Sequence, residues 1–289
     1  MLIRASSALY AVIGDPVGHS LSPVLHNYMI NEFGLNAVYV AFRVPKSSLR
    51  RCLDSFKILG LSGINVTVPH KETVCQYVDD SSDEVKTLGA ANTLKIQNDH
   101  ISAHVTDPYG FLESLGTDKE RFIDAPVLIL GAGGAARSVL FALSKLNPGK
   151  VFLYNRTLEK AQILAQEAKK IYDLDIQTIE QTALSSAISQ SSVIVNTTSV
   201  GMSPDYNKSP LQDFSAFSQQ HYVYDLIYNP GKTRLLFKAE HRGSKIKNGL
   251  DMLIFQGLQS LRIWMDENLS LSEKQLKELR GLLRSELGG

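Results

Sequence analysis

The chain has 289 residues, of which 44% are hydrophobic and 20% are charged, and its formal net charge is +1. The length allows two domains with ordinary cores, and the nearly neutral charge argues against a nucleic-acid partner. No apolar run approaches the roughly 20 residues of a membrane span, and the first residues lack the apolar core of a signal peptide. The only cysteines, Cys52 and Cys75, form no metal-ligand spacing, so we expect no metal site and a cytoplasmic location.

The first hundred residues alternate between strand and helix patterns. Strands are predicted at 9–13, 37–42, 63–68 and 91–96, and helical segments at 23–33, 47–59 and 71–88. Glycine or proline ends most of these segments, as at Gly14, Gly34 and Pro69. This alternation predicts a small α/β domain with a mostly parallel sheet.

A second alternating pattern follows a short helix at 108–115. Its predicted strands are 127–130, 151–154, 175–178, 192–196 and 222–226, and its helices are 134–146, 158–171, 181–188 and 232–241. Two final helices, 250–268 and 272–287, are expected to return to the first domain. The prediction is therefore an α/β chain with a substrate domain (1–107 and 245–289), a Rossmann-type domain (108–244) and a deep cleft between them.

A glycine-rich turn follows the first strand of the second domain. It reads Gly131-Ala132-Gly133-Gly134-Ala135 and leads directly into a helix. Gly131 allows the tight turn, and Gly133 lets the backbone approach a pyrophosphate. Exposed N–H groups at the start of the helix would bind the phosphates.

The next strand ends on residues that favour NADP over NAD. NAD-binding folds usually place Asp or Glu here for the ribose 2′-hydroxyl. This chain has Asn155-Arg156-Thr157, with Lys160 one turn later. A guanidinium and a hydroxyl suit a 2′-phosphate, which no carboxylate repels. The alternative is a surface arginine after an ordinary βαβ unit.

Uncharged polar residues gather near the predicted strand ends of the first domain. They are Ser20, Ser22, Asn65, Thr67, Asn92, Thr93 and Thr106. In an open α/β sheet the carboxyl ends of the strands face the ligand, and hydroxyls and carboxamides suit a polyhydroxylated substrate. Structural roles stay open, because the two serines can cap a helix and the other residues can satisfy a strand or a turn.

Lys71 and Asp107 are the predicted acid–base pair. Lys71 follows a predicted strand, and Asp107 precedes a predicted helix. Together in one cleft they would form a charged pair suited to proton transfer beside a hydride acceptor. If the two residues are unrelated, the lysine is a solvated side chain and the aspartate is a helix cap.

In order along the chain, these motifs resemble those of the shikimate dehydrogenase family. The resemblance rests on residues 13–27, 63–71, 89–94, 106–107, 131–135, 155–157, 196–202, 225–230 and 248–256. The family uses NADP to interconvert 3-dehydroshikimate and shikimate in aromatic amino-acid biosynthesis. The resemblance therefore implies a two-domain α/β enzyme with a small-molecule substrate, no nucleic-acid or membrane partner, and a monomeric or homodimeric state.

The resemblance also implies roles for individual positions. Lys71 matches the catalytic lysine and Asp107 its partner, while Ser20 and Ser22 match serines that bind the substrate carboxylate. The other implied substrate contacts are Asn65, Thr67, Asn92, Tyr228 and Gln256. The implied cofactor contacts are Asp83, Gly131, Ala132, Gly133, Gly134, Ala135, Asn155, Arg156, Thr157, Lys160, Thr198, Leu226, Gly249 and Met252.

The residues around the aspartate depart from the family pattern, which usually reads Asn-Thr-Asp-Gly. This chain has Val105-Thr106-Asp107-Pro108, and the proline restricts the residue before it toward extended geometry. Two alternatives stay open: a quinate/shikimate dehydrogenase with broader substrate or NAD use, and a non-catalytic regulatory protein that responds to NADP or shikimate. The Ser-x-Ser-Pro and Asn-x-Thr-x-Pro-x-Lys segments argue against a glutamyl-tRNA-reductase-like domain.

Overall fold

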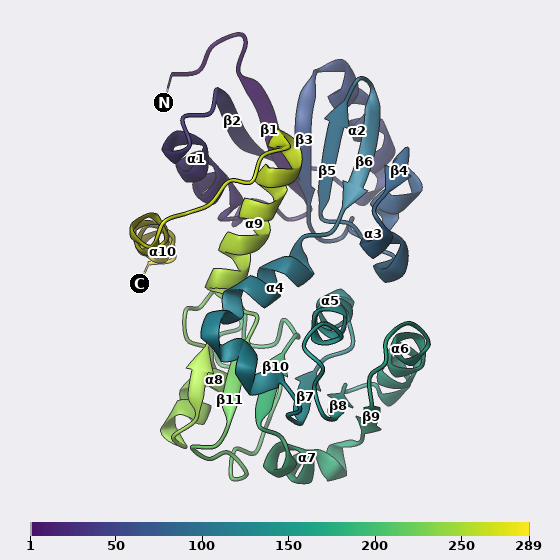
Figure 1. Ribbon diagram of the computed structural model, residues 1–289, viewed down its shortest axis with the longest axis vertical. Coiled ribbons are helices and arrows are strands. Elements are labelled where there is room, and N and C mark those ends of the chain that lie inside the picture. Colours follow the sequence, from purple (N-terminus) through teal and green to yellow (C-terminus); the bar gives the residue numbers. More distant parts are fainter. Residues whose placement is uncertain (1, 289) are drawn as a thin grey trace. The chain divides into compact units, whose positions relative to one another are not determined.

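The computed structural model describes residues 2–288, which form two compact units. The first unit runs to Gly110 and resumes over Ile254–Gly288, and the second unit spans Phe111–Leu253. Each unit contains one six-stranded sheet (Figure 1). The boundaries predicted from the sequence lie at 107/108 and 244/245. No helix in the described part of the chain is both long and apolar enough to span a membrane.

The sheet of the first unit is mixed. Its strands are β1 (Ala8–Gly14), β2 (Ala37–Arg43), β3 (Leu61–Val66), β4 (Asp80–Ser81), β5 (Thr93–Gln97) and β6 (His100–His104), in the order β2-β1-β3-β5-β6-β4. β1 pairs in parallel with β2 and β3, and β4 pairs in parallel with β6. β5 is antiparallel to both of its neighbours.

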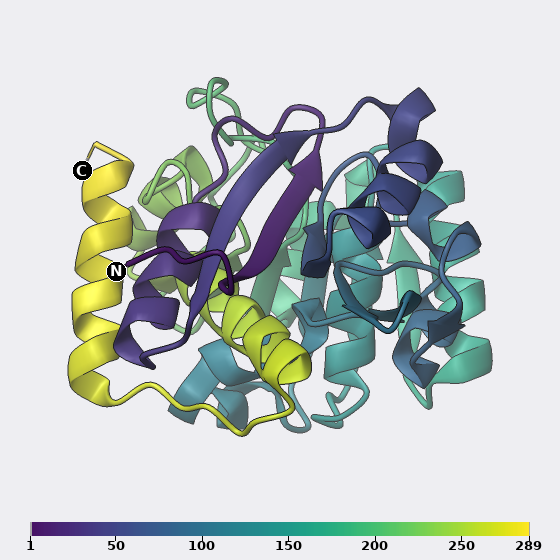
Figure 2. The same cartoon turned by 90° about the horizontal axis from the view of Figure 1, so that it is seen from above.

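Helices cover both faces of this sheet. They are α1 (Ser22–Glu32), α2 (Leu49–Ile58), α3 (Asp83–Leu88) and the end of α9 (Leu250–Met265), with short 3₁₀ turns at Lys46–Ser48 and Thr73–Gln76. α10 (Glu273–Glu286) packs on α1. α1 and α9 lie on one face of β1 to β3, and α2 lies on the other (Figures 1 and 2). Trp264 of α9 stacks on Tyr10, with ring centroids 4.7 Å apart. A Cβ at Gly63 would lie 2.3 Å from the Trp264 Nε1, so only glycine lets this indole approach the sheet.

The β5–β6 hairpin and the short strand β4 were not predicted from the sequence. Asn98 and Asp99 join β5 to β6, and both have positive φ angles, of 53° and 63°. Two left-handed residues match the type I′ turns that close tight hairpins. The prediction of continuous helical turns over 71–88 is wrong, because this stretch contains a 3₁₀ turn, β4 and α3.

The sheet of the second unit is entirely parallel. Its strands are β7 (Val127–Leu130), β8 (Val151–Tyr154), β9 (Ile176–Ile179), β10 (Val193–Asn196), β11 (Tyr222–Asp225) and β12 (Lys245–Lys247), in the order β12-β11-β10-β7-β8-β9. Numbered within this unit, the order is 3-2-1-4-5-6 read from β9, as in dinucleotide-binding domains. Every residue of β7, β8, β10 and β11 is buried, as expected for parallel strands covered on both faces.

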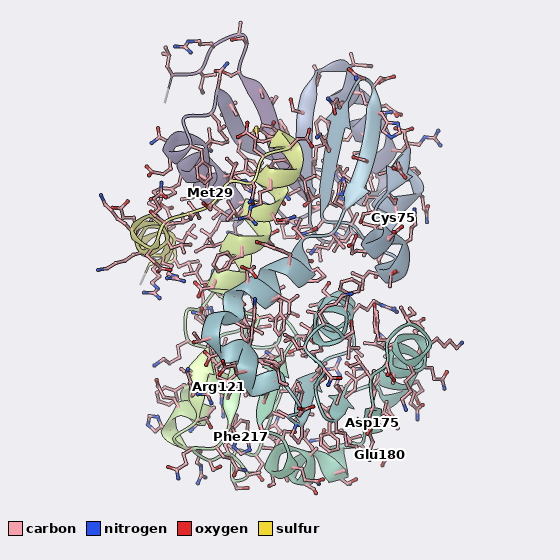
Figure 3. All side chains as sticks on the ribbon, in the orientation of Figure 1. Met29, Cys75, Arg121, Asp175, Glu180 and Phe217 are labelled. Atoms are coloured by element: carbon pink, nitrogen blue, oxygen red, sulfur yellow. The ribbon has the colours of Figure 1, made fainter. Side chains whose placement is uncertain are left out.

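The helices of the second unit pack on both faces of this sheet. They are the end of α4 (Asp107–Leu115), α5 (Gly134–Leu143), α6 (Leu158–Ile171), α7 (Leu184–Gln190), α8 (Arg234–His241) and the start of α9, with 3₁₀ turns at Gly116–Phe122 and Gln181–Ala183. Val127 and Ile129 pack in the core with α5 and α6, whereas Leu128 and Leu130 pack with α7 and α8. Figure 3 labels Phe217, which belongs to the core around Leu128 and Leu130, and Met29 of the first unit. Both residues are buried.

Candidate active site

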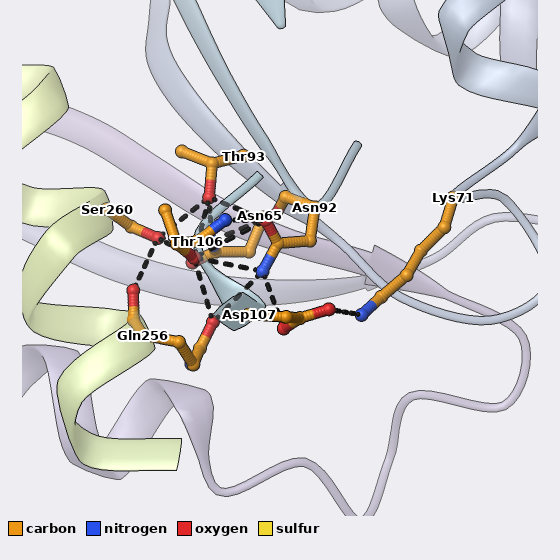
Figure 4. Close-up of polar contacts among 8 residues, drawn as sticks. All are labelled: Asn65, Lys71, Asn92, Thr93, Thr106, Asp107, Gln256 and Ser260. Carbon is orange, nitrogen blue, oxygen red and sulfur yellow. Dashed lines mark hydrogen bonds and ion pairs between the residues drawn. The ribbon is translucent and has the colours of Figure 1, made fainter. Parts of the chain in front are cut away.

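Lys71 and Asp107 form an ion pair in the first unit. Lys71 follows β3, Asp107 opens α4, and 36 positions separate them in the sequence. The Lys71 Nζ lies 2.6 Å from the Asp107 Oδ2 (Figure 4). Their side chains are 34% and 18% exposed, so both remain accessible to a ligand. The structure therefore brings together the two residues that the sequence predicts as an acid–base pair.

Asp107 is held from both sides, although its neighbours depart from the family pattern. The Asn92 Nδ2 donates to its second oxygen, Oδ1, at 3.0 Å. Pro108 lies in the first turn of α4, where its missing N–H costs no helical hydrogen bond. Val105 packs against the core of the first unit. Both unusual residues therefore fit the structure with the ion pair intact.

Asn65 has both ends of its carboxamide bonded within the protein. Its Nδ2 donates to the Ser260 Oγ at 2.9 Å and to the Thr93 Oγ1 at 3.2 Å. Its Oδ1 accepts from the Tyr39 Oη at 2.8 Å. Because the side chain is only 7% exposed, these bonds fix the orientation of the amide.

Gln256 of α9 joins the same polar cluster (Figure 4). Its Oε1 accepts from the Asn92 Nδ2 at 3.2 Å and from the Thr106 Oγ1 at 3.4 Å. Ser260, one helical turn later, forms a hydrogen bond with Thr93 at 2.8 Å. Hydroxyl and carboxamide groups from β3, β5, α9 and the start of α4 therefore meet beside the ion pair.

The polar motifs of the sequence include Thr93 and Thr106 but not two other members of this cluster, Tyr39 and Ser260. Ser260 had a usable signal, because it lies four residues after Gln256 and therefore on the same helix face as that glutamine. Tyr39 carried no signal, because an aromatic residue in a strand usually belongs to the core.

Among the remaining predicted residues of the first unit, Ser22 contacts this cluster through the Tyr39 hydroxyl, whereas the side chains of Ser20, Thr67 and Asp83 form no described hydrogen bond with it. Ser20 and Ser22 flank the N-cap of α1, but that helix has no side-chain cap; instead, the Ser20 Oγ accepts from the Ser22 N–H at 3.2 Å. The structure thus does not support the capping role for these serines. Thr67 is half-buried just after β3. Asp83 begins α3, and its nearly fully exposed side chain pairs with Lys86 at 3.4 Å.

The glycine turn of the second unit provides an open helix start. Gly131 has a φ of +110°, and a Cβ there would lie 2.7 Å from the Thr197 Oγ1, so the position requires glycine. Gly133 caps α5 with no side-chain hydrogen bond, and the first turn contains no acidic residue. A Cβ at Gly133 or Gly134 would meet no atom within 4 Å. Free N–H groups and open space fit a pyrophosphate.

The residues after β8 fit a phosphate on the ribose. The Asn155 Nδ2 donates to the Thr157 carbonyl at 2.8 Å and shapes the turn that leads into α6. Arg156 and Lys160 are exposed, and neither side chain forms a hydrogen bond or ion pair with any other described residue. A 2′-phosphate would give these cations a partner.

The residues predicted at the nicotinamide end follow β10 and β11 or precede α9. Thr198 follows β10, and Leu226 and Tyr228 follow β11. A Cβ at Gly249 would lie 1.9 Å from the Leu226 carbonyl oxygen, so these two segments touch and the position requires glycine. Leu226 also packs with Met252 on the core of the second unit. Burial raises the pKa of Tyr228 above its ordinary value.

A buried carboxylate, Asp225, ends β11 beside these residues. It accepts from the Asn196 Nδ2 at 2.9 Å, the Ile227 N–H at 3.1 Å and the Thr233 Oγ1 at 2.7 Å. Within residues 2–288 it forms no ion pair with a lysine, arginine or histidine. Burial outweighs the three hydrogen bonds and raises the pKa of Asp225 from 3.8 to about 6.

This raised pKa predicts how stability changes with pH. Because the fold favours the protonated carboxyl of Asp225, this group stabilises the folded state fully below the pKa that it has in the unfolded chain. That stabilisation is lost as the pH rises through about 6. We expect the free energy of unfolding of the wild type, relative to Asp225→Asn, to fall by roughly 1 kcal/mol between about pH 5 and pH 7.5. Denaturant unfolding of both proteins at the two pH values measures this difference. A difference that is constant or rises with pH would contradict the prediction.

The described residues contain no cluster of ligands that could hold a metal ion. The chemistry available in the first unit is that of an ion pair beside neutral hydrogen-bonding groups. Such groups can bind an oxygen-rich molecule and move a proton.

The second unit has the sheet order and glycine turn of a dinucleotide-binding domain, and the first unit has an accessible lysine–aspartate pair. Together these features define the class of two-domain nicotinamide-dependent dehydrogenases. The family model described as the shikimate dehydrogenase substrate binding domain matches residues 12–94, and the model described as shikimate / quinate 5-dehydrogenase matches residues 115–223. The chain is 41% identical over 283 residues to the shikimate dehydrogenase (NADP(+)) of Aquifex aeolicus, covering 97% of this chain and 100% of that relative. The chain belongs to the shikimate dehydrogenase family.

Solved structures agree with this assignment. Shikimate 5-dehydrogenase of Thermus thermophilus, in complex with NADP(H) and shikimate, is 32% identical with a TM-score of 0.84, covering 96% of this chain and 99% of that chain. Quinate dehydrogenase of Corynebacterium glutamicum, in complex with NAD, is 26% identical with a TM-score of 0.86, also covering 96% and 99%. The predicted family and α/β fold class are confirmed. Since quinate dehydrogenase has the same fold, the fold alone does not select the substrate.

Proposed function

We propose that this protein is an NADP-dependent shikimate dehydrogenase that reversibly reduces 3-dehydroshikimate to shikimate in aromatic amino-acid biosynthesis. The observation that carries the proposal is the Lys71–Asp107 ion pair beside a buried cluster of hydroxyl and carboxamide groups. This cluster suits a small ring with several hydroxyls, and the pair supplies acid–base chemistry. The activity named for the Aquifex aeolicus relative supports the same reaction.

The cofactor NADPH, when bound, supplies the hydride that the C3 carbon of 3-dehydroshikimate receives. Lys71 gives a proton to the C3 oxygen in this direction and takes it back in the reverse direction. Asp107 accepts one N–H of the ammonium at 2.6 Å, which leaves two N–H groups for the substrate oxygen. Asn92 holds the other carboxylate oxygen of Asp107 and thus keeps the pair oriented.

The other proposed contacts follow the geometry of each unit. Ser20 and Ser22 would bind the substrate carboxylate, and Asn65, Thr67, Asn92, Gln256 and Tyr228 would contact the rest of the substrate. The backbone over 131–135 would hold the pyrophosphate, and Arg156 with Lys160 the 2′-phosphate. The further cofactor contacts would be Asp83, Asn155, Thr157, Thr198, Leu226, Gly249 and Met252.

Isotope transfer tests the proposed reaction directly. The protein is incubated with 3-dehydroshikimate and with NADPH that carries deuterium on the transferable position of the nicotinamide. We expect shikimate with deuterium on C3, detected by mass spectrometry and NMR. Shikimate that lacks the label, or an absence of product from protein that binds both ligands, would contradict the proposal.

Removing the phenolic hydroxyl of Tyr39 is expected to weaken substrate binding. Tyr39→Phe deletes the donor to the Asn65 Oδ1 and frees a carboxamide that we place against the substrate. A lost neutral hydrogen bond of about 1 kcal/mol corresponds to an increase of roughly fivefold in the KM for shikimate. Steady-state kinetics would show this increase with the KM for NADP⁺ unchanged.

Tyr10→Phe is the matched control, because Tyr10 is also buried on this sheet and stacks on Trp264. It should leave both KM values unchanged. Equal effects of the two substitutions would show that the Tyr39 hydroxyl has no specific link to the substrate.

We also propose a cytoplasmic location and a monomer or homodimer. Cys52 and Cys75 are both free thiols, which supports a reducing compartment.

A further inference from the structure

The proposed chemistry does not use Asp225, although its carboxylate is completely buried. Taking an unpaired carboxylate out of water is unfavourable, and a neutral side chain of the same size would avoid that cost. A carboxylate differs from a carboxamide in one useful way, because both of its oxygens only accept hydrogen bonds. Asp225 can therefore receive the donors Asn196, Ile227 and Thr233 together, whereas asparagine would turn an NH₂ group toward one of them.

Two of these donors, Asn196 and Ile227, belong to segments that carry predicted cofactor contacts. The Asn196 Oδ1 accepts from both the N–H and the Oγ1 of Thr198, at 3.0 and 2.8 Å. The Leu226 N–H donates to the Asn196 carbonyl at 3.0 Å. The Gly249 N–H donates to the Ile227 carbonyl at 3.1 Å. A single carboxylate therefore links the loop after β10, the turn after β11 and, through that turn, the approach to α9.

We propose that Asp225 is a positioning residue for the nicotinamide half of the NADP site. Its Oδ1 fixes the Asn196 amide, which in turn orients Thr198, and the same oxygen fixes the turn that contains Leu226. The inference rests on the proposed function, since it assumes that these residues meet the nicotinamide. The adenosine half of the site, at Arg156 and Lys160, has no described hydrogen bond to this network.

This separation allows a test with two ligands. Binding of NADP⁺ and of adenosine 2′,5′-bisphosphate, which contains only the adenosine half, is measured by calorimetry for the wild type and for Asp225→Asn. We expect the Kd for NADP⁺ to rise about fivefold or more, with the Kd for adenosine 2′,5′-bisphosphate unchanged. In the same variant kcat should fall, because a misplaced nicotinamide loses alignment with the substrate.

Asp213→Asn is the matched control, since Asp213 is exposed in the same unit and accepts from the N–H and Oγ of Ser215, outside the segments that carry predicted cofactor contacts. It should bind both ligands as the wild type does. An unchanged Kd for NADP⁺ in Asp225→Asn, or an equal loss for both ligands, would overturn the inference. A wild type that binds no NADP⁺ would contradict the proposed function and, with it, this inference.

Thr233 provides a second test that does not depend on the folding of Asp225→Asn. Thr233→Val removes the donor to the Asp225 Oδ2, whereas Thr233→Ser keeps a hydroxyl at that position. Both variants remain unchanged at Asp225. We expect valine to weaken NADP⁺ binding selectively and serine to restore it to the wild-type value. Equal behaviour of the two variants would contradict the positioning role.

Discussion

Replacing Lys71 with alanine is expected to lower kcat for shikimate oxidation by about a hundredfold to ten-thousandfold, with a smaller change in KM. A positioned acid–base group typically contributes this much to the rate. The Lys71 Nζ carries the proton that we route to and from the substrate oxygen, and alanine leaves no group at that position to replace it. Steady-state kinetics with shikimate and NADP⁺ measures both constants and separates transition-state from ground-state effects.

Lys57→Ala is the matched control for this prediction. Lys57 also forms an ion pair with an aspartate in the first unit, its Nζ lying 3.2 Å from the Asp79 Oδ2. The same change to a second lysine–aspartate pair should leave kcat near the wild-type value. If Lys71→Ala retained the wild-type kcat, the lysine would not be the acid–base group.

Replacing Arg156 with alanine is expected to raise the Kd for NADP⁺ about tenfold to a hundredfold while leaving the Kd for NAD⁺ unchanged. Hydrogen bonds between charged groups contribute roughly 1.5 to 3 kcal/mol, which corresponds to this range. Because the Arg156 side chain has no ion-pair partner among the described residues, its loss breaks no internal contact. Fluorescence or calorimetric titration with the two nucleotides checks the selectivity.

Arg242→Ala removes another exposed arginine of the second unit, at the end of α8, and should affect neither nucleotide. An equal loss of affinity for NADP⁺ and NAD⁺ in Arg156→Ala would show that the guanidinium does not contact the 2′-phosphate.

The fold of the second unit could be predicted closely because most of its strands can be identified from their own residues and from the turns that follow them. Strands such as Val127–Leu130 are continuous apolar runs, as buried parallel strands require, and a glycine turn follows this one directly. β12 escaped prediction because Lys245–Lys247 is only three residues long and mostly polar. Its pairing with β11 supplies the order that the local sequence lacks.

In the first unit the sequence predicted β1, β2, β3 and β5 but not the hairpin partner of β5. The turn residues Asn98 and Asp99 form a weaker signal than the Asn-Gly or Asp-Gly pair that usually marks such turns. β6 does alternate between polar and apolar residues, with Ile101 and Ala103 buried, so its period was readable.

The candidate site, like the fold, could be predicted only in part. The types and positions of Lys71, Asp107 and Asn92 could be read from the sequence, together with the family resemblance. The groups that hold them could not, because Tyr39 and Ser260 reach Asn65 from 26 and 195 positions away. The same holds for Asp225, whose importance depends on the side chains that its buried oxygens meet.

The initial rate of NADPH or NADH formation in four mixtures decides between the proposed activity and its alternatives. Shikimate and quinate are each offered NADP⁺ and NAD⁺ at matched concentrations. We predict rapid turnover with shikimate and NADP⁺ and far slower turnover in the other three mixtures. Comparable rates with quinate or NAD⁺ would contradict this specificity and favour a broader quinate/shikimate dehydrogenase. No turnover in any mixture, from protein that binds NADP⁺, would contradict the enzymatic role and favour a regulatory protein.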